Sequence, residues 1–123
     1  WRFNSGFVSY ESQKIVATGM VYKGTGDYRG IAINAKGIPF DQEGYSIFAD
    51  VKLPGNKFSI FGRHDFFNMN TEIDDSDVKT KIVGLTYYLI QGCKFIIDYD
   101  FSDYSDLPDY KESKIQTAIE VKF

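Results

Sequence analysis

Apolar and polar residues alternate along most of this chain with a period of two. In residues 94–104, for example, Phe95, Ile97 and Tyr99 share one parity, whereas Asp98 and Asp100 share the other. Such alternation is typical of half-buried β-strands, and helical periodicity is almost absent. We therefore predict eight strands, over roughly residues 2–10, 14–23, 28–36, 44–53, 57–66, 79–90, 94–104 and 113–123.

The segments between these strands differ in length and composition. Three are short and contain glycine, as tight hairpin turns require, and three are longer and polar. The short ones are KGTGDY (23–28), PGN (54–56) and QGC (91–93), and the long ones cover 37–44, 67–78 and 103–112. Short turns at one end and long loops at the other predict an antiparallel up-and-down meander. Outer-membrane barrels have this arrangement, and soluble up-and-down barrels show it less regularly.

The predicted strands are long. Strands of soluble proteins average about five or six residues, whereas a tilted strand needs about nine to eleven to cross a bilayer. Strands of about ten residues, repeated along the chain, favour a membrane barrel.

One face of each clear strand is apolar, and the other carries charge. A soluble barrel would turn the apolar face inward around a ligand, whereas a membrane barrel would turn it outward to lipid. The charged face still carries large apolar side chains, which a freely exposed outer surface would rarely keep: Phe48, Phe61, Ile82, Tyr88 and Ile96. Aromatic residues near strand ends suit the interfacial girdles of a membrane barrel. Those residues are Tyr45, Phe58, Phe66, Tyr99, Phe101, Tyr104 and Phe123.

Composition narrows the classes of partner. Aromatic residues make up 17% of the chain, which favours strands, and the net charge is only −3. No stripe of Lys and Arg indicates a nucleic-acid partner. The single cysteine, Cys93, excludes an internal disulfide, and no apolar run is long enough for a transmembrane helix. The chain starts at Trp1 without a signal peptide, so we expect it to be processed or a piece of something longer.

The charged face supplies the candidate functional residues. Basic side chains along a pore wall attract anions and set selectivity, although each could also simply solvate the wall beside an acidic neighbour. Arg63 and Asp65 form the best single pair, because residues two apart on a strand share a face. The pore-lining candidates are Lys36, Asp50, Lys52, Lys57, Arg63, Asp65, Asp98, Asp100, Glu120 and Lys122.

Other candidate chemistry is weak. The clustered carboxylates of TEIDDSDV (71–78) and of 103–112 could hold Ca²⁺ or Mg²⁺, but TEIDDSDV lacks the spacing of an EF-hand loop. We therefore interpret both stretches as solvated surface loops. His64 is the only histidine and has no evident co-ligands for a metal. No nucleophile–base pair or phosphate-binding loop is present in the sequence, so we expect neither an enzyme nor a cofactor.

The stretches GYSIFADVKLPGNKFSIFGRHDFFN (44–68), KIVGLTYYLIQGCKFIIDYDFSDY (81–104) and IQTAIEVKF (115–123) resemble the C-terminal strands of phosphate-selective-type outer-membrane porins. The resemblance covers roughly residues 28–123. It implies a sixteen-stranded barrel that forms trimers with water-filled pores and long extracellular loops. This chain would then be the C-terminal half of such a barrel, or a divergent small one. It also implies that Ile119, Val121 and Phe123 are the signal read by the barrel-assembly machinery. Phosphate selectivity is not implied, because the residues that confer it lie largely outside the similar region.

Three functions follow as hypotheses. The first is an outer-membrane porin-like channel for passive diffusion of small hydrophilic, including anionic, solutes, embedded in outer-membrane lipid with the loops 37–44, 67–78 and 103–112 outside the cell. The second is a soluble, lipocalin-like barrel that binds a small apolar ligand. The third is a structural barrel that sheathes a larger complex without free diffusion.

Overall fold

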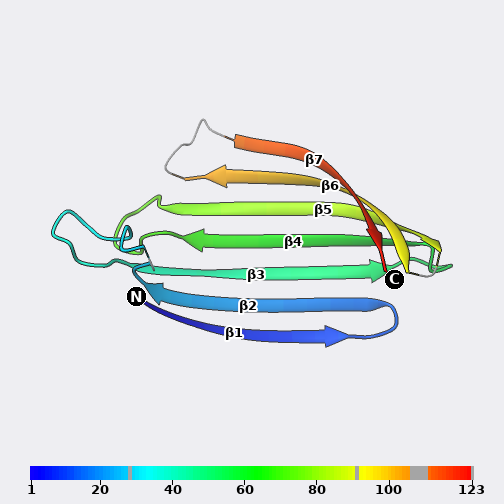
Figure 1. Ribbon diagram of the computed structural model, residues 1–123, viewed down its shortest axis with the longest axis horizontal. Helices are drawn as coiled ribbons and strands as arrows, with labels where there is room; N and C mark the ends of the chain where they lie inside the picture. Colours follow the sequence, from blue (N-terminus) through cyan, green and yellow to red (C-terminus); the bar gives the residue numbers. More distant parts are fainter. Residues whose placement is uncertain (28, 91, 106–110, 123) are drawn as a thin grey trace.

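The computed structural model describes residues 1–27, 29–90, 92–105 and 111–122. Within these residues the chain forms one open antiparallel sheet of seven strands in sequential order, and it contains no helix (Figure 1). The strands are β1 (Arg2–Glu11), β2 (Ile15–Thr25), β3 (Asp41–Lys52), β4 (Phe58–Asn68), β5 (Asp77–Ile90), β6 (Cys93–Tyr104) and β7 (Lys111–Val121). The predicted all-β meander is confirmed, and the strands have the predicted length of ten residues or more. No helix in the described ranges is long and apolar enough to cross a membrane.

The predicted strand over 28–36 is wrong. Its described part, residues 29–36, lies in a long loop between β2 and β3, where only Ile33 forms an isolated bridge, to Pro39. Two side chains take the backbone donors that a sheet would need. Asp27 accepts N–H groups of Ile31 and Ala32 at 2.6 and 2.8 Å, and Asn34 accepts those of two residues that follow it. Such local bonds compete with strand pairing, so the alternation of this segment does not produce a strand.

Without the predicted strand over 28–36, short and long connections alternate regularly along the chain. Short connections join β1 to β2, β3 to β4 and β5 to β6, and longer ones join β2 to β3, β4 to β5 and β6 to β7. The predicted hairpin turn over 23–28 is wrong, because residues 23–25 belong to β2. The short connections lie at one end of the sheet and the long ones at the other (Figure 1). β7 therefore runs from the loop end to the turn end, parallel in direction to β1.

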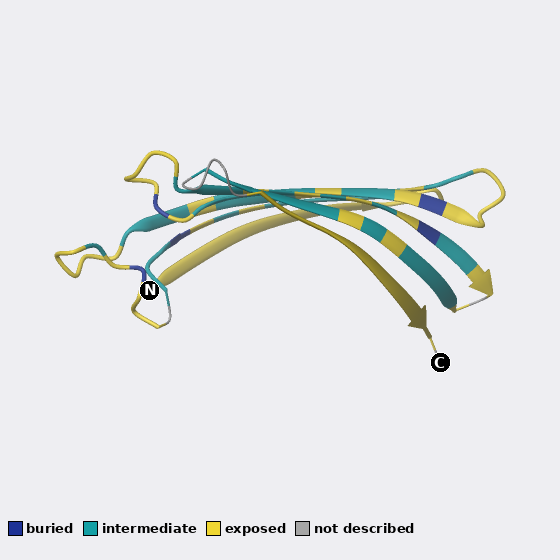
Figure 2. Ribbon diagram, turned by 90° about the horizontal axis from the view of Figure 1, so that it is seen from above, coloured by how far each residue is buried: buried dark blue, intermediate teal, exposed yellow. Residues whose placement is uncertain are grey.

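The sheet is a single curved layer without a hydrophobic core (Figure 2). Ala32 is the only buried apolar residue among those described, whereas Ser59, Asn70 and Thr86 are buried polar ones. The accessible surface is 9004 Å², and a compact protein of this mass exposes about 6,700 Å². Most apolar side chains of the sheet therefore lack a covering layer within this chain.

Candidate functional site

Cross-strand pairing brings the apolar parities of β3–β7 to one side of the sheet, where they meet Val8 and Tyr10 of β1 and Ile15 and Val21 of β2. Tyr45 pairs with Phe66, Ile60 with Leu85, and Leu85 with Ile97, so these side chains share a face. We call this side the apolar face. Its exposed large side chains are Val8, Tyr10, Ile15, Val21, Ile47, Val51, Phe58, Ile60, Val83, Leu85, Ile97, Tyr99, Ile115, Ile119 and Val121.

The opposite side, which we call the polar face, is the less exposed of the two. Along β3, residues 44, 46, 48, 50 and 52 are half-buried, whereas Ile47, Ala49 and Val51 on the apolar face are exposed. Ser59 and Thr86 are buried on the polar face although no second layer covers them. Side chains crowd together on the inner side of a curved sheet, so the polar face is the concave one.

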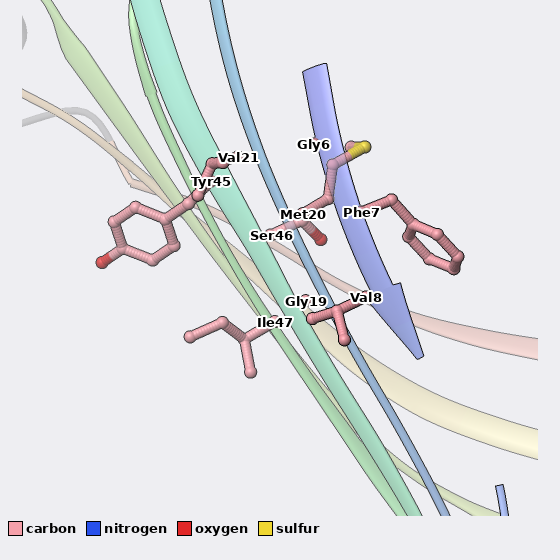
Figure 3. Close-up of a pocket in the computed structure, with 9 residues that line it drawn as sticks. All are labelled: Gly6, Phe7, Val8, Gly19, Met20, Val21, Tyr45, Ser46 and Ile47. Carbon is pink, nitrogen blue, oxygen red and sulfur yellow. The ribbon is translucent and has the colours of Figure 1, made fainter. Parts of the chain in front are cut away.

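Figure 3 shows the two sides where β1, β2 and β3 lie together. Tyr45 and Ile47 project to one side of the sheet, and Phe7 and Met20 project to the other. On the apolar face, Gly6 and Gly19 leave a hollow of about 540 Å³, because neither residue has a side chain to fill it. The apolar face is therefore hollowed over β1–β3.

Several candidate residues lie together on the polar face. The predicted Arg63–Asp65 pair is present, with Arg63 Nε 2.8 Å from Asp65 Oδ2. Asp50 accepts a hydrogen bond of 2.8 Å from the buried Ser59 hydroxyl. The candidates that belong to strands on this face are Asp50, Lys52, Arg63, Asp65, Asp98, Asp100 and Glu120.

Three basic candidates lie elsewhere. Lys36 is in the loop between β2 and β3, where its backbone N–H donates to Asn34 Oδ1 at 3.0 Å. Lys57 is in the turn before β4, and Lys122 follows the end of β7. Lys36 therefore lies at the loop end of the sheet, and the other two at the turn end.

Two basic residues of the polar face were missed from the sequence. Lys94 forms an ion pair of 2.9 Å with Glu120, and Lys114 forms one of 3.2 Å with Asp100. Both lie on the same parity as acidic candidates of their strands, so parity alone could have found them. Their partners could not be found that way, because pairing between β6 and β7 depends on register.

The apolar face ends in charged rows at the loop end. Lys23 pairs with Glu43 at 3.5 Å, and Lys79 pairs with Asp77 at 2.9 Å. Next to them lies the stacked pair Tyr45–Phe66, with ring centroids 5.4 Å apart. A second stacked pair, Phe58–Tyr87 at 4.8 Å, lies near the turn end. One of the predicted girdle residues differs, because Tyr104 lies on the polar face. Another, Phe123, lies outside the described residues, so its prediction is not tested.

The band of apolar residues on this face drifts along the strands from β1 to β7. At the loop end, the band begins at Gly6 in β1. The residue of β7 in the same cross-strand row as Gly6 is Lys111, but the band in β7 begins only at Ile115, four residues further along the strand. At the turn end, the band in β1 ends at Tyr10, whose cross-strand row contains Ile115 in β7. The band in β7 continues six residues beyond Ile115, to Val121. The band therefore does not cross the strands at a right angle, and the strands are tilted relative to it.

The potential metal ligands of the described residues are not clustered. These residues contain no group of three or more His, Cys, Asp or Glu side chains placed to hold a metal ion. His64 lies on the apolar face, where its Nε2 is 3.4 Å from the Tyr45 hydroxyl. The Cys93 thiol is free and half-buried.

The assembly-signal candidates Ile119 and Val121 lie exposed on the apolar face of β7. Phe123 lies outside the described residues. No protein family matches this chain, and no curated protein or solved structure is similar enough to count as a match.

Proposed function

We propose that this chain forms part of the wall of a transmembrane β-barrel of the bacterial outer membrane, through which small hydrophilic solutes diffuse. One observation carries the proposal: the apolar face of the sheet is its exposed, convex face, and the polar face is concave. A barrel with a greasy interior, as in a lipocalin, would need the opposite curvature. A barrel in lipid needs apolar residues outside and a polar lumen.

The height of the apolar band supports this proposal. In β4 it extends from Phe58 to Phe66, which are on the apolar face at both ends. Nine residues at about 3.3 Å each span about 30 Å along the strand, or about 23–26 Å when the strand is tilted by 30–40°. Outer-membrane barrels carry an apolar band of about 25 Å.

The drift of the band supports it independently. Four to six residues over the six steps from β1 to β7 correspond to a tilt of about 25–35°, at about 3.3 Å per residue and 4.8 Å between strands. Strands of transmembrane barrels are tilted by about 35–45°.

The borders of the band also fit a bilayer. Stacked aromatic pairs lie near both ends. At the loop end the Lys23–Glu43 ion pair lies one row beyond the aromatic pair, and Lys79, in the row of Phe66, pairs with Asp77 one row beyond it. Aromatic rings are favoured at the membrane interface, and charges beyond it. By this proposal the long loops lie outside the cell, and Ile119 and Val121 belong to the assembly signal that ends at Phe123.

The sheet would need further strands to close. β1 and β7 run in the same direction, so an all-antiparallel barrel requires an odd number of additional strands between these two edges. Nine more would complete the sixteen-stranded barrel of the porins that the sequence resembles. The trimeric state belongs to the same proposal.

The charge of the polar face bears on the choice of solute. Its described strand residues include seven carboxylates, Glu11, Asp50, Asp65, Asp98, Asp100, Glu112 and Glu120, and four cations, Lys52, Arg63, Lys94 and Lys114. This part of the wall favours cations over anions. The expected preference for anions therefore finds no support in this charge balance.

Spin labels at two adjacent isoleucines test the proposal. In a Cys93→Ser background, Ile97→Cys would place a label on the apolar face and Ile96→Cys would place one on the polar face. In lipid vesicles, we expect the label at 97 to be relaxed by oxygen, which concentrates in the bilayer, and the label at 96 by a water-soluble nickel complex. Equal accessibility of both labels to the nickel complex would refute a lipid-facing apolar surface.

Conductance separates diffusion from a purely structural role. We expect the assembled protein to give stepwise currents in a planar bilayer, and a sealed sheath to give none. A chain that is monomeric and stable in detergent-free buffer would contradict both and support the soluble carrier.

A further inference from the structure

A hollow of about 380 Å³ lies on the polar face over β1–β4. Two neighbouring cross-strand rows supply its lining: Phe7, Met20 and Ser46 in one, and Thr18, Phe48 and Arg63 in the next. Its size lies within the range of small-molecule sites, about 300–1,000 Å³. Residues from four strands therefore meet in one concave surface of mixed chemistry.

The apolar part of this hollow presents aromatic rings. Phe7 is 70% exposed and projects from the polar side of the sheet together with Met20 (Figure 3). Phe48 packs against Phe61 of the next cross-strand row, with ring centroids 6.3 Å apart, and this contact supports the Phe48 ring. An exposed ring on a water-facing wall offers a π-face, whose negative potential attracts the weakly positive C–H groups of a ligand.

The polar part contains both donors and acceptors. Arg63 uses Nε for Asp65, at 3.0 Å to Oδ1 and 2.8 Å to Oδ2, so its terminal nitrogens remain as donors. The Thr18 and Ser46 hydroxyls can donate or accept. Asp65 balances the charge of Arg63, so the hollow has no net charge to attract an ion.

We propose that this hollow is a binding subsite for neutral saccharides. A pyranose ring has an apolar C–H face, which would stack on Phe7 or Phe48, and a rim of hydroxyls, which would bond to Arg63, Thr18 and Ser46. A carboxylate ligand would find the charge of Arg63 already balanced by Asp65, and a cationic ligand would meet Arg63. The inference rests on the proposed function in one respect: it needs the polar face to be a water-filled wall.

Titration with maltotriose, an uncharged glucose trisaccharide, tests the subsite. The protein is held in a zwitterionic detergent, since alkyl glycoside detergents would compete. We expect saturation-transfer NMR to detect weak binding, with a Kd on the order of 1 mM. Phe7→Leu should weaken binding about three- to tenfold, because one aromatic contact is lost. The Phe7 side chain is 70% exposed, so this change should leave folding intact.

The matched control is Phe95→Leu, which removes a ring from the apolar face of β6. It should leave the affinity for maltotriose unchanged. Absence of binding, an equal effect of the two variants, or tighter binding of benzoate than of maltotriose would overturn the proposal. If the protein conducts ions but does not bind maltotriose, the saccharide subsite is refuted and the proposed channel is not. If it binds maltotriose through Phe7 but does not conduct, the proposed channel is refuted and the subsite is not.

Discussion

At the scale of single residues, glycines on the polar face lie beneath aromatic rings. A Cβ on Gly44 would lie 2.6 Å from Tyr22 Cζ, and one on Gly84 would lie 2.6 Å from Phe61 Cε1. On the apolar face, a Cβ on Gly62 would meet nothing closer than 3.8 Å. Glycine covered by an aromatic ring is a device that bends sheets into barrels. These residues therefore explain why the sheet curves toward its polar face.

This crowding predicts different outcomes for two alanine substitutions. Gly84→Ala should destabilise the sheet by about 1–3 kcal/mol, because the new methyl group overlaps Phe61 and lies 2.8 Å from Asp98 Cβ. Gly62→Ala should be neutral or stabilise by about 0.4–1 kcal/mol, since it only restricts the unfolded chain. Urea unfolding in lipid vesicles would measure both free energies. Equal destabilisation by both variants would contradict the conclusion that the polar face is the crowded one.

Asp27 predicts a pH-dependent loop. Its carboxylate accepts backbone N–H groups of Ala32, Ile31 and Arg29, and these bonds, that of Ala32 most strongly, hold the pKa of Asp27 below its usual value. A depressed pKa means that the bonds stabilise the loop fully above the ordinary value of about 3.9 and stop doing so as the pH falls through the lower folded pKa.

We therefore expect Asp27→Asn to increase hydrogen exchange at the Ile31 and Ala32 amides at pH 6. The difference from the wild type should shrink toward pH 2, where the native carboxyl is protonated as well. A difference that is the same at both pH values would show that the charge of Asp27 is not what orders the loop.

At the scale of the element, each strand carries two different surfaces. In β6, Ile96 and Ile97 are adjacent and chemically identical, yet Ile97 is exposed on the apolar face and Ile96 is half-buried on the polar face. Successive side chains of a strand point to opposite sides, and crowding on the concave polar face then makes the two exposures unequal. In the proposed barrel, one isoleucine faces lipid and the other faces water.

Lysine at these two positions should therefore have unequal effects. Ile97→Lys should cost about 2–4 kcal/mol of stability, since it places a charge in the lipid-facing band. Ile96→Lys should cost much less, because its ammonium group reaches the aqueous face. Unfolding of both variants in vesicles gives the comparison, and a larger cost at position 96 would reverse the proposed inside and outside.

At the scale of the whole molecule, the sheet has two ends and two open edges. Lys36 lies in a long loop, and Lys57 lies in a short turn at the other end. The unpaired backbones of β1 and β7 are sites where further strands would add. The two ends of the sheet therefore differ in their loops, and lysines at each end can report which end faces outward.

The two lysines test the orientation. On intact cells, a membrane-impermeant amine reagent should label Lys36 and leave Lys57 unmodified, because only the long loops are proposed to face outward. After permeabilisation both should react, and mass spectrometry of the peptides would record each. Labelling of Lys57 alone on intact cells would show that the barrel is inserted the other way.

The sequence by itself determined the strand type, the strand length and the two-faced character of each strand, because alternation and turn glycines act locally. Even the Arg63–Asp65 pair followed from parity. Only the tertiary structure decided which residues face one another across strands, because register is a long-range property. It placed Lys114 beside Asp100, turned the alternating segment 29–36 into a loop held by Asp27 and Asn34, and made the polar face concave. Curvature depends on glycines of one strand meeting rings of the next, and no single strand contains that information.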